Sequence, residues 1–298
     1  MTPRRLAFIG VGRMGDPMAA RLLRSGFDVA VYDRDPLRLA AFVAEHGGRA
    51  ASSPADAGAG ADTVITMLPD GGVVRQALVG PAGIAAALAP DSVVVDMGSS
   101  DPEDTRATGA ELARRGLRLV DAPVMGGVAF ARNASLDILA GGDPAAVAHC
   151  EPVLAALGRR IYRCGPLGAG HTLKAIANFI NAATFSAVLE GMAVGRKAGL
   201  DTALMAEALT ALCAGRQHPL EKKVVPHVLT RSYGTGMALG LIAKDLRIAV
   251  GLAERNGAAA PIAECVASIW REAGELCGGN ADQAEIVTYW EEKGDVRL

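Results

Sequence analysis

The hydrophobic residues of the first half of the chain form short runs, separated by stretches with the spacing of amphipathic helices. Short apolar runs bounded by glycine or proline are typical of strands that are buried on both faces of a sheet. Their alternation with helices predicts repeated βαβ units, and therefore an α/β fold with a mostly parallel, doubly wound sheet. The predicted strands are residues 6–9, 27–32, 63–68, 92–96, 117–120, 136–140 and 160–163, with helices at 102–115 and 144–157 among those between them.

The pattern changes near residue 165, beyond which we predict no further strand. Glycine, proline and N-capping residues divide the remaining chain into helices. We therefore expect two domains: residues 1–165 form the α/β domain, and residues 166–298 form an all-helical C-terminal domain. The predicted helices are residues 169–198, 202–213, 219–230, 238–256, 261–277 and 282–292.

The first of these helices, residues 169–198, is apolar on every side over most of its length. A helix without a polar face is normally buried all round, so we expect this one in the core of the second domain or at its interface. Lys174 and Asn178 interrupt its apolar first half at a spacing that places them one turn apart on one face. Either the lysine extends its ammonium group to solvent or meets a carboxylate, or it lies in a catalytic cleft with Asn178 beside it.

Composition narrows the class of protein. The 298 residues suffice for two domains of roughly 100–200 residues each. The 30 basic and 32 acidic residues nearly balance, which gives no basis for binding nucleic acid or a membrane surface. No uninterrupted apolar run reaches the roughly 18–20 residues that span a bilayer, and the N-terminal run is too short for a signal peptide.

The five cysteines are odd in number and scattered, with no C-x-x-C pair. We interpret them as reduced thiols, and we expect a cytoplasmic protein. No cluster of histidine, cysteine and carboxylate residues has the spacing of metal ligands, so we predict no metal site.

The chemistry begins with Gly10-Val11-Gly12-Arg13-Met14-Gly15, which lies between the first predicted strand and a helix. The acidic residue Asp33 follows at the end of the second strand. This context indicates a Rossmann-type dinucleotide site, where glycines let the backbone approach a pyrophosphate and the helix N-terminus offers free N–H groups. Asp33 would accept from the ribose hydroxyls and favour NAD. Arg34 could instead bind a 2′-phosphate, so NADP remains the alternative.

Several other turns follow predicted strands, at residues 69–72, 97–101 and 121–127. Ligands of open α/β sheets bind outside the carboxyl ends of the strands. We therefore expect these turns to lie at the same edge as the glycine loop.

Four segments resemble the β-hydroxyacid dehydrogenases, a family that includes 3-hydroxyisobutyrate dehydrogenase and tartronate semialdehyde reductase. The resemblance covers nearly the whole chain in the same order and spacing. Lys244-Asp245-Leu246 is similar to a further motif of the family. The four segments are FIGVGRMGDPMA (8–19), DMGSSDP (96–102), DAPVMGG (121–127) and GAGHTLKAIAN (168–178).

The resemblance implies roles at the matching positions. The loop of residues 10–15 would hold the cofactor, Met67, Leu68 and Pro69 would line its adenosine side, and Ser99 would lie near the nicotinamide ribose. Gly126 and Gly127 would offer N–H groups to a substrate carboxylate, and Lys244 would approach the cofactor and close the cleft. Lys174 would be the catalytic lysine, with Asn178 as its companion.

The implied reaction moves a hydride between nicotinamide and the hydroxyl-bearing carbon of a small β-hydroxyacid. The hydroxyl loses a proton on oxidation, and the oxyanion gains one on reduction. A lysine whose pKa is lowered by burial can serve as this acid or base.

Two positions depart from the family pattern. Met125 replaces the usual serine, and a thioether cannot donate to a substrate carboxylate as a hydroxyl does. The substrate would then be bound differently, unless Met125 only packs and the adjacent glycines suffice. Gly98, where serine is common, should have little effect.

Two further features have competing interpretations. Arg216, His218, Lys222 and Lys223 could form a cationic pocket for a second anionic group of the substrate, or they form a solvated charged face beside Glu221. We favour the solvated face. His171, close to Lys174, is expected to be a satisfied structural residue.

Two alternative functions remain for the chain: a related reductase of imines or of aldehydes without a carboxylate, and a non-catalytic nucleotide-binding module. The lysine argues against the imine reductase and, with its site, against the non-catalytic module. The apolar helical domain predicts a homodimer or homotetramer.

Overall fold

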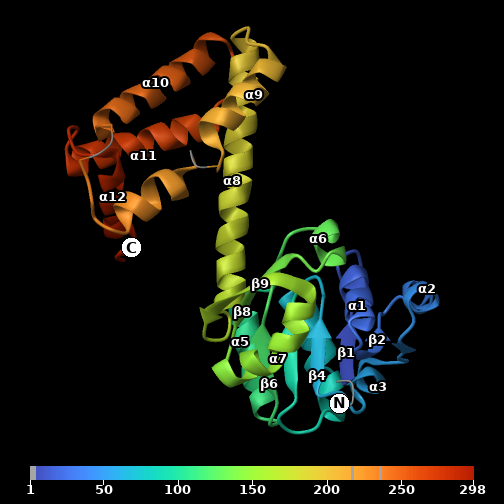
Figure 1. Ribbon diagram of the computed structural model, residues 1–298. Coiled ribbons are helices and arrows are strands. Elements are labelled where there is room, and N and C mark those ends of the chain that lie inside the picture. Colours follow the sequence, from blue (N-terminus) through green and yellow to red (C-terminus); the bar gives the residue numbers. More distant parts are fainter. Residues whose placement is uncertain (1–4, 216–217, 235–236) are drawn as a thin grey trace. The chain divides into compact units, whose positions relative to one another are not determined.

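The computed structural model describes residues 5–215, 218–234 and 237–298, and it contains two compact units, residues 1–179 and 180–298. The first unit is built on a nine-stranded sheet (Figure 1). The strands are β1 (Arg5–Ile9), β2 (Asp28–Tyr32), β3 (Arg49–Ala50), β4 (Thr63–Thr66), β5 (Val93–Asp96), β6 (Arg118–Asp121), β7 (Val124–Met125), β8 (Leu136–Gly141) and β9 (Gly158–Gly165).

The sheet has the order β3-β2-β1-β4-β5-β6-β8-β7, with β9 paired to β8. Neighbours from β3 to β6 are parallel, and β8 runs antiparallel to β6 and β7. The register places Ile9 opposite Thr66, Thr66 opposite Asp96, and Asp96 opposite Asp121. These four residues end their strands, so the turns that follow share one edge of the sheet. The mostly parallel sheet and helical second region confirm the predicted fold class.

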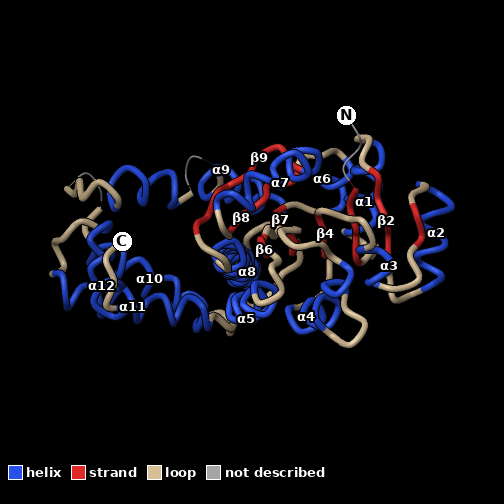
Figure 2. The backbone as a smooth tube through the Cα atoms, turned by 90° about the horizontal axis from the view of Figure 1, so that it is seen from below, coloured by secondary structure: helices blue, strands red, loops and turns tan. Residues whose placement is uncertain are grey.

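Helices cover both faces of this sheet (Figure 2). Aspartate or serine caps several of their N-termini, and proline often follows in the first turn, as the sequence patterns indicate. They are α1 (Gly15–Arg24), α2 (Pro36–His46), α3 (Pro54–Gly58), α4 (Gly71–Val79), the short η1 (Ile84–Ala87), α5 (Pro102–Ala113), α6 (Val128–Arg132) and α7 (Pro144–Leu157).

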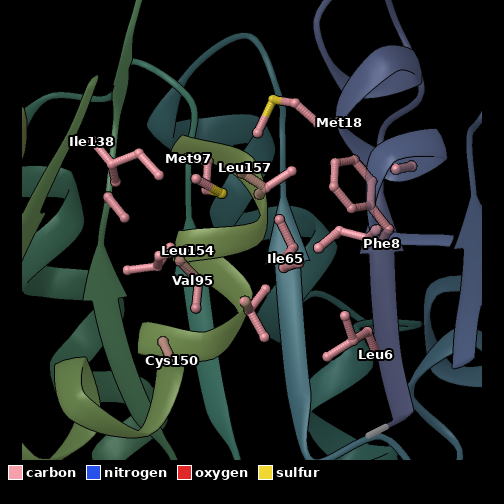
Figure 3. Close-up of a cluster of buried hydrophobic side chains, with 14 of the residues drawn as sticks. Leu6, Phe8, Met18, Ile65, Val95, Met97, Ile138, Cys150, Leu154 and Leu157 are labelled. Atoms are coloured by element: carbon pink, nitrogen blue, oxygen red, sulfur yellow. The ribbon is translucent and has the colours of Figure 1, made fainter. Parts of the chain in front are cut away.

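Two layers of aliphatic side chains hold these helices on the sheet. One face packs Phe8, Ile65 and Val95 against Met18 of α1 and Leu154 of α7 (Figure 3). The opposite face packs a second buried cluster against α3, α4 and α5. The strands are therefore buried on both faces, which explains their unbroken apolar runs.

The rest of the chain is helical, as predicted. Its helices are α8 (Ala169–Lys197), α9 (Thr202–Cys213), η3 (Leu220–Val228), α10 (Leu239–Arg255), α11 (Pro261–Cys277), the short η4 (Gln283–Ile286) and α12 (Val287–Gly294). The last predicted helix, residues 282–292, is thus a 3-10 turn followed by an α-helix. Residues 124–125, expected in a turn, form the short strand β7 because they pair with Asp137 and Ile138 of β8.

Helix α8 has the predicted length, but the expectation that it is buried is wrong for the single chain. Phe179 and Phe185 are 71% and 64% exposed. Within the described residues, α8 is also the one helix long and apolar enough to cross a membrane by length and composition. Our expectation of no such segment considered only uninterrupted apolar runs. The polar contacts of Glu190, which accepts from the first N–H groups of α11, tie α8 into the protein fold.

Candidate active site

The glycine loop after β1 has the geometry that its sequence predicts. Gly10 has a φ of 97°, and a Cβ there would lie 2.6 Å from the carbonyl oxygen of Met67. A Cβ on Gly15 would lie 1.9 Å from the carbonyl oxygen of Gly10. Both positions therefore require glycine for packing of the loop against α1 and β4.

Gly12 differs, because a Cβ at this position would meet no atom within 4 Å. The open space beside it belongs to a cavity of about 880 Å³ at the carboxyl ends of β1, β2 and β4. The backbone at Gly12 can thus approach a ligand closely, next to the N-terminus of α1. The residues present fit the pyrophosphate of a dinucleotide.

Most residues predicted to bind the cofactor line this one cavity. Val11 is buried outside this lining and donates its N–H to Asp33, and Ser99 is exposed on the loop after β5, also outside the lining. Tyr32, Val73 and Gln76 also line the cavity, without a sequence signal that singles them out. The predicted residues on its wall are Gly10, Gly12, Arg13, Met14, Gly15, Asp33, Arg34, Met67, Leu68 and Pro69.

Asp33 is buried and already has donors within the protein. Its Oδ2 accepts from the Val11 N–H at 2.9 Å, and its Oδ1 accepts from the Asp35 N–H at 2.9 Å. Arg38 of α2 also pairs with Oδ1 at 3.4 Å. Sequence reasoning missed Arg38, which places a second arginine beside Arg34 on the cavity wall and partly neutralises the carboxylate that should repel a 2′-phosphate.

Lys174 lies in the second turn of α8 and is half-buried. Its Nζ donates to the carbonyl oxygen of Val124 and contacts the Met125 sulfur at 3.3 Å. Burial lowers the pKa of Lys174 below its ordinary value, because desolvation disfavours the charged ammonium. The lysine is therefore directed toward β7 and is not extended into solvent.

Gly126 and Gly127 follow Met125 directly, and Gly127 precedes α6. Gly126 has a φ of 113°, which favours glycine. Asn178 lies one turn after Lys174 on α8 and is exposed. The structure thus brings Lys174 to Met125 at the start of the turn that the sequence assigns to substrate binding.

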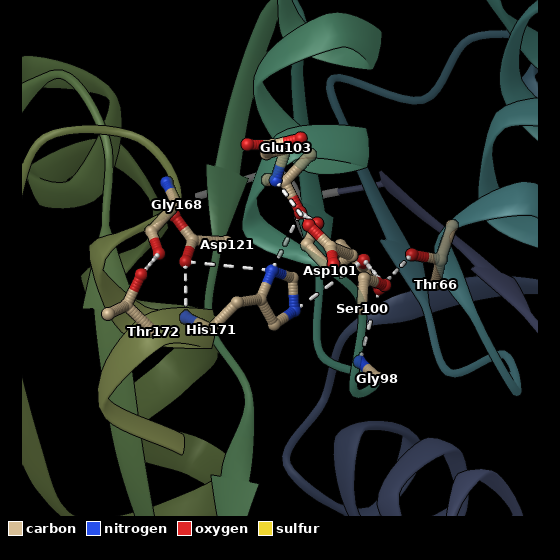
Figure 4. A network of polar contacts seen from close by, with 11 residues as sticks. Thr66, Gly98, Ser100, Asp101, Glu103, Asp121, Gly168, His171 and Thr172 are labelled. Carbon is tan, nitrogen blue, oxygen red and sulfur yellow. Dashed lines mark hydrogen bonds and ion pairs between the residues drawn. The ribbon is translucent and has the colours of Figure 1, made fainter. Parts of the chain in front are cut away.

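A buried polar cluster lies at the carboxyl ends of β5 and β6 (Figure 4). His171 is 1% exposed, and its ring lies between the carboxylates of Asp96 and Asp121, which end β5 and β6. Asp96 accepts from Thr66, Gly98 and Ser100, and Asp121 accepts from backbone N–H groups at the start of α8. Neither aspartate was singled out from the sequence, because neither follows the glycine loop at the spacing that marked Asp33.

The remaining predicted residues belong to the helical unit. Lys244 of α10 is exposed and pairs with Asp245 at 2.9 Å. His218 and Lys222 lie before and within η3, but Arg216 of the same cationic cluster lies outside the described residues. None of the five cysteines forms a disulfide within the described residues.

Both halves of the chain match family models of nicotinamide-dependent dehydrogenases. Residues 5–165 match the family model described as the NAD binding domain of 6-phosphogluconate dehydrogenase. Residues 168–290 match the NAD-binding domain of NADP-dependent 3-hydroxyisobutyrate dehydrogenase. The 2-(hydroxymethyl)glutarate dehydrogenase of Eubacterium barkeri is 32% identical, over 99% of this chain and 97% of that relative.

Solved structures show the same architecture. The 3-hydroxyisobutyrate dehydrogenase of Mycobacterium tuberculosis, solved with L-serine, has a TM-score of 0.67 and 29% identity, covering 97% of this chain and 99% of that one. An imine reductase from Myxococcus stipitatus with NAD⁺ has a TM-score of 0.86, covering 97% and 100%. Its identity of 22% limits that comparison to the fold.

A strand-end cavity with a glycine loop, on a chain that matches nicotinamide-dependent enzymes throughout, defines an NAD(P)-dependent oxidoreductase. More narrowly, the chain belongs to the β-hydroxyacid dehydrogenase family, whose chemistry is oxidation of the CH–OH group of a hydroxyacid.

Proposed function

We propose that Lys174 is the general acid and base of this enzyme, acting on the hydroxyl group of a small β-hydroxyacid. The observation that carries the proposal is its half-buried ammonium, directed at Val124 and Met125 beside the Gly126-Gly127 turn. When bound, the nicotinamide accepts or returns the hydride at the hydroxyl-bearing carbon. In oxidation, neutral Lys174 takes the hydroxyl proton, and in reduction the ammonium returns it to the oxygen.

Asn178 and the two glycines have supporting roles in this proposal. Asn178, one turn from Lys174, orients the lysine or the substrate. Gly126 and Gly127 bind the substrate carboxylate through their N–H groups. Ser99 binds near the nicotinamide ribose, and Lys244 closes over the cofactor.

The test compares Lys174→Ala and Lys174→Arg with the wild type. Both variants should lose about 10²–10⁴-fold in kcat while still binding the reduced cofactor. Oxidation by the wild type should rise with pH through the pKa of Lys174, which burial places below that of an ordinary lysine, and reduction should fall over the same range. If Lys174→Ala keeps turnover within a few-fold of wild type, the assignment is wrong.

Met125 points to the substrate class. Since Nζ lies 3.3 Å from the sulfur, a hydroxyl bound to Lys174 brings the neighbouring carbon atoms close to an apolar thioether that cannot donate. We propose a 3-hydroxy acid with a carbon substituent at C2, whose first atoms would lie against the thioether. The relative that acts on 2-(hydroxymethyl)glutarate supports this class.

A series of 3-hydroxypropanoates differing only at C2 tests the substrate class. The series carries hydrogen, methyl, propyl, amino or carboxyethyl there, and it is assayed with NAD and with NADP. We expect alkyl or carboxyethyl to give a higher kcat/KM than hydrogen or amino. The opposite ranking would exclude a contact between Met125 and the substituent.

For the cofactor we propose NAD. NADP is the alternative, because Arg34 and Arg38 on the cavity wall would be the residues that bind its 2′-phosphate. The Asp33 carboxylate, which would accept from the ribose hydroxyls, already pairs with Arg38. Arg38→Ala should raise the KM for NADP while changing that for NAD little. Equal changes would show that Arg38 has no part in discrimination.

Reduction of imines or of aldehydes without a carboxylate is the second candidate function. The fold shared with imine reductases and the missing hydroxyl at position 125 favour it, whereas Lys174 argues against the imine version. Binding of the cofactor without turnover of any acid, aldehyde or imine would instead support a non-catalytic module. Turnover of a cyclic imine with no turnover of hydroxyacids would select the imine reductase.

We further propose that residues 1–165 bind the dinucleotide and that residues 166–298 complete the substrate site and form a homodimer or homotetramer in the cytoplasm. The exposed apolar surface of α8 and α9 supports the oligomer. A sedimentation mass of one chain at micromolar concentration would contradict the oligomer.

The hypothesis that Arg216 contacts a second anionic group predicts a raised KM for doubly anionic acids in Arg216→Ala.

A further inference from the structure

The first turn of α8 contains a buried histidine that the chemistry proposed for Lys174 does not use. His171 Nε2 lies 3.7 Å from Asp96 Oδ2, and Nδ1 lies 3.7 Å from Asp121 Oδ2 (Figure 4). Within the described residues, the ring makes one direct hydrogen-bond contact, between Nδ1 and Thr105 Oγ1 of α5 at 2.9 Å. Nε2 is buried and has no hydrogen-bond partner in the described part of the chain.

The surroundings of Thr105 assign the direction of that hydrogen bond. Its hydroxyl oxygen also lies 2.9 Å from the carbonyl oxygen of Asp101, which can only accept. A threonine hydroxyl has a single proton to donate, and we assign this proton to Asp101, because a carbonyl oxygen, unlike a histidine nitrogen, cannot donate in return. The hydroxyl oxygen therefore accepts from His171, so the ring carries a proton on Nδ1.

The backbone of the same turn is fixed by Asp121. Its two carboxylate oxygens accept from the N–H groups of Gly168 and His171, both at 2.7 Å. Those contacts attach the start of α8 to β6. The His171 side chain adds a contact from this turn to α5.

Lys174 follows His171 by three residues, a spacing that makes the two neighbours on one side of the helix. Lys174 in turn must place Nζ on the carbonyl of Val124 and the sulfur of Met125. A small rotation of the first turn would move Nζ away from both. Displacements of about 1 Å at reacting groups can cost about 10²-fold in rate.

We propose that His171 is a positioning residue for Lys174, acting through the Nδ1–H bond to Thr105 that fixes the first turn of α8 against α5. This inference rests on the proposed role of Lys174. It assigns a specific task to one nitrogen of the ring, so variants that retain different nitrogens can test it.

The experiment compares His171→Asn, His171→Gln and His171→Leu. The asparagine amide nitrogen takes the place of Nδ1, whereas that of glutamine takes the place of Nε2. We expect His171→Asn to keep kcat within about threefold, and the other two to lose about 10- to 100-fold. Affinity for the reduced cofactor, followed by its fluorescence, should change less than about twofold, because the glycine loop is untouched.

A second readout separates positioning from loss of folded protein. With deuterium on the hydroxyl-bearing carbon, the isotope effect on kcat should increase in His171→Leu, because a displaced lysine slows the chemical step. An inactive fraction would lower kcat without changing the isotope effect. Thr105→Val removes the acceptor with a smaller change in volume, and it should reproduce His171→Leu without adding to it in the double variant.

His149 of α7 supplies the matched control, since its Nε2 lies 3.4 Å from Thr63, the first residue of β4, at the opposite edge of the sheet. His149→Asn should change neither kcat nor the isotope effect. An unchanged isotope effect in both His171→Leu and Thr105→Val, or full rescue by glutamine but not asparagine, would overturn the proposal. If Lys174→Ala itself stays active, the proposed function fails instead, and His171 has no lysine to position.

Discussion

The α/β unit and the helical unit bury apolar side chains to very different extents. In the α/β unit, two large clusters cover both faces of the sheet, and residues such as Phe8 and Ile65 are fully buried. Among the described residues of the helical unit, the buried clusters are small, one around Val228 and one around Leu239. The first core is thus complete within one chain, whereas the described part of the helical unit buries few apolar side chains.

Several large apolar side chains of the helical unit are exposed. Phe185 of α8 is 64% exposed, and Leu189, Leu204 and Leu212 on α8 and α9 are also exposed. Apolar surface of this kind on adjacent helices is typical of a protein interface. The α/β unit thus has a complete core of its own, whereas the helical unit leaves apolar side chains of α8 and α9 exposed, which supports the proposed oligomer.

The largest expected effect is on assembly. Phe185→Asp places a charge on the exposed apolar surface of α8, and in a symmetric dimer the substitution acts twice. Loss of a buried phenylalanine costs about 1.5–3 kcal/mol per side, so we expect a dissociation constant raised by at least about 10²-fold. Sedimentation velocity across a dilution series measures it. As a control, Leu37→Asp on α2 of the α/β unit should leave the sedimenting mass unchanged. An unchanged mass in Phe185→Asp would show that Phe185 lies outside any interface.

A core substitution tests the self-sufficiency of the α/β unit. Ile65→Ala should cost about 2–5 kcal/mol in the free energy of unfolding of that unit, because Ile65 is fully buried in β4. Leu37→Ala, on an exposed side chain, should cost less than about 0.5 kcal/mol.

Both tryptophans, Trp270 and Trp290, lie in the helical unit. Their fluorescence therefore follows that unit, while circular dichroism follows both. Ile65→Ala should lower the midpoint of the dichroism transition that belongs to the α/β unit. The transition followed by tryptophan fluorescence should stay unchanged. A common shift of both signals would show that the units unfold together and that the comparison of their cores is misplaced.

Two glycines separate folding from binding within the α/β unit. Gly15→Ala forces a methyl group against the carbonyl of Gly10, so we expect it to lower the stability of this unit and abolish cofactor binding. Gly12→Ala has space for its methyl group within the protein, but the group projects where the pyrophosphate must approach. It should weaken cofactor affinity about tenfold at unchanged stability. Equal stability losses in the two variants would contradict this assignment.

The smallest effect concerns acid sensitivity of the helical unit. Arg231 forms an ion pair with Glu291 and lowers the pKa of that carboxyl through its hydrogen bond. A depressed pKa stabilises the fold above the ordinary carboxyl pKa, and this contribution is lost as the pH falls through the lowered value. Between about pH 6 and about pH 3, the urea midpoint from tryptophan fluorescence should fall more in wild type than in Glu291→Gln. Parallel curves would show that the pair contributes nothing.

Much of the fold followed from local sequence patterns. The helix at residues 144–157 was predicted with its observed bounds, because Asp143 caps it and Pro144 begins it. The strand β7 was missed because two residues carry no periodicity, and their pairing depends on β8 more than ten residues later. Arg38 was missed because its ion pair with Asp33 spans a turn. The conformation of that turn depends on the glycine loop, which binds Asp33.

By itself the sequence determined the features that depend on local backbone chemistry. These include the glycine loop, the alternation of strands and helices, and the placement of Lys174 on a long apolar helix. Such features follow from residue type and spacing, because backbone freedom, capping and periodicity act over a few residues.

Only the tertiary structure decided which distant groups meet. It placed the Met125 sulfur on the Lys174 ammonium, although the two residues are 49 positions apart, and it placed His171 between two strand-end carboxylates. It also showed that α8 is exposed in the single chain, where its composition had indicated burial. Contacts of this kind depend on strand register and on the packing of distant elements, and neither is encoded within a few residues of sequence.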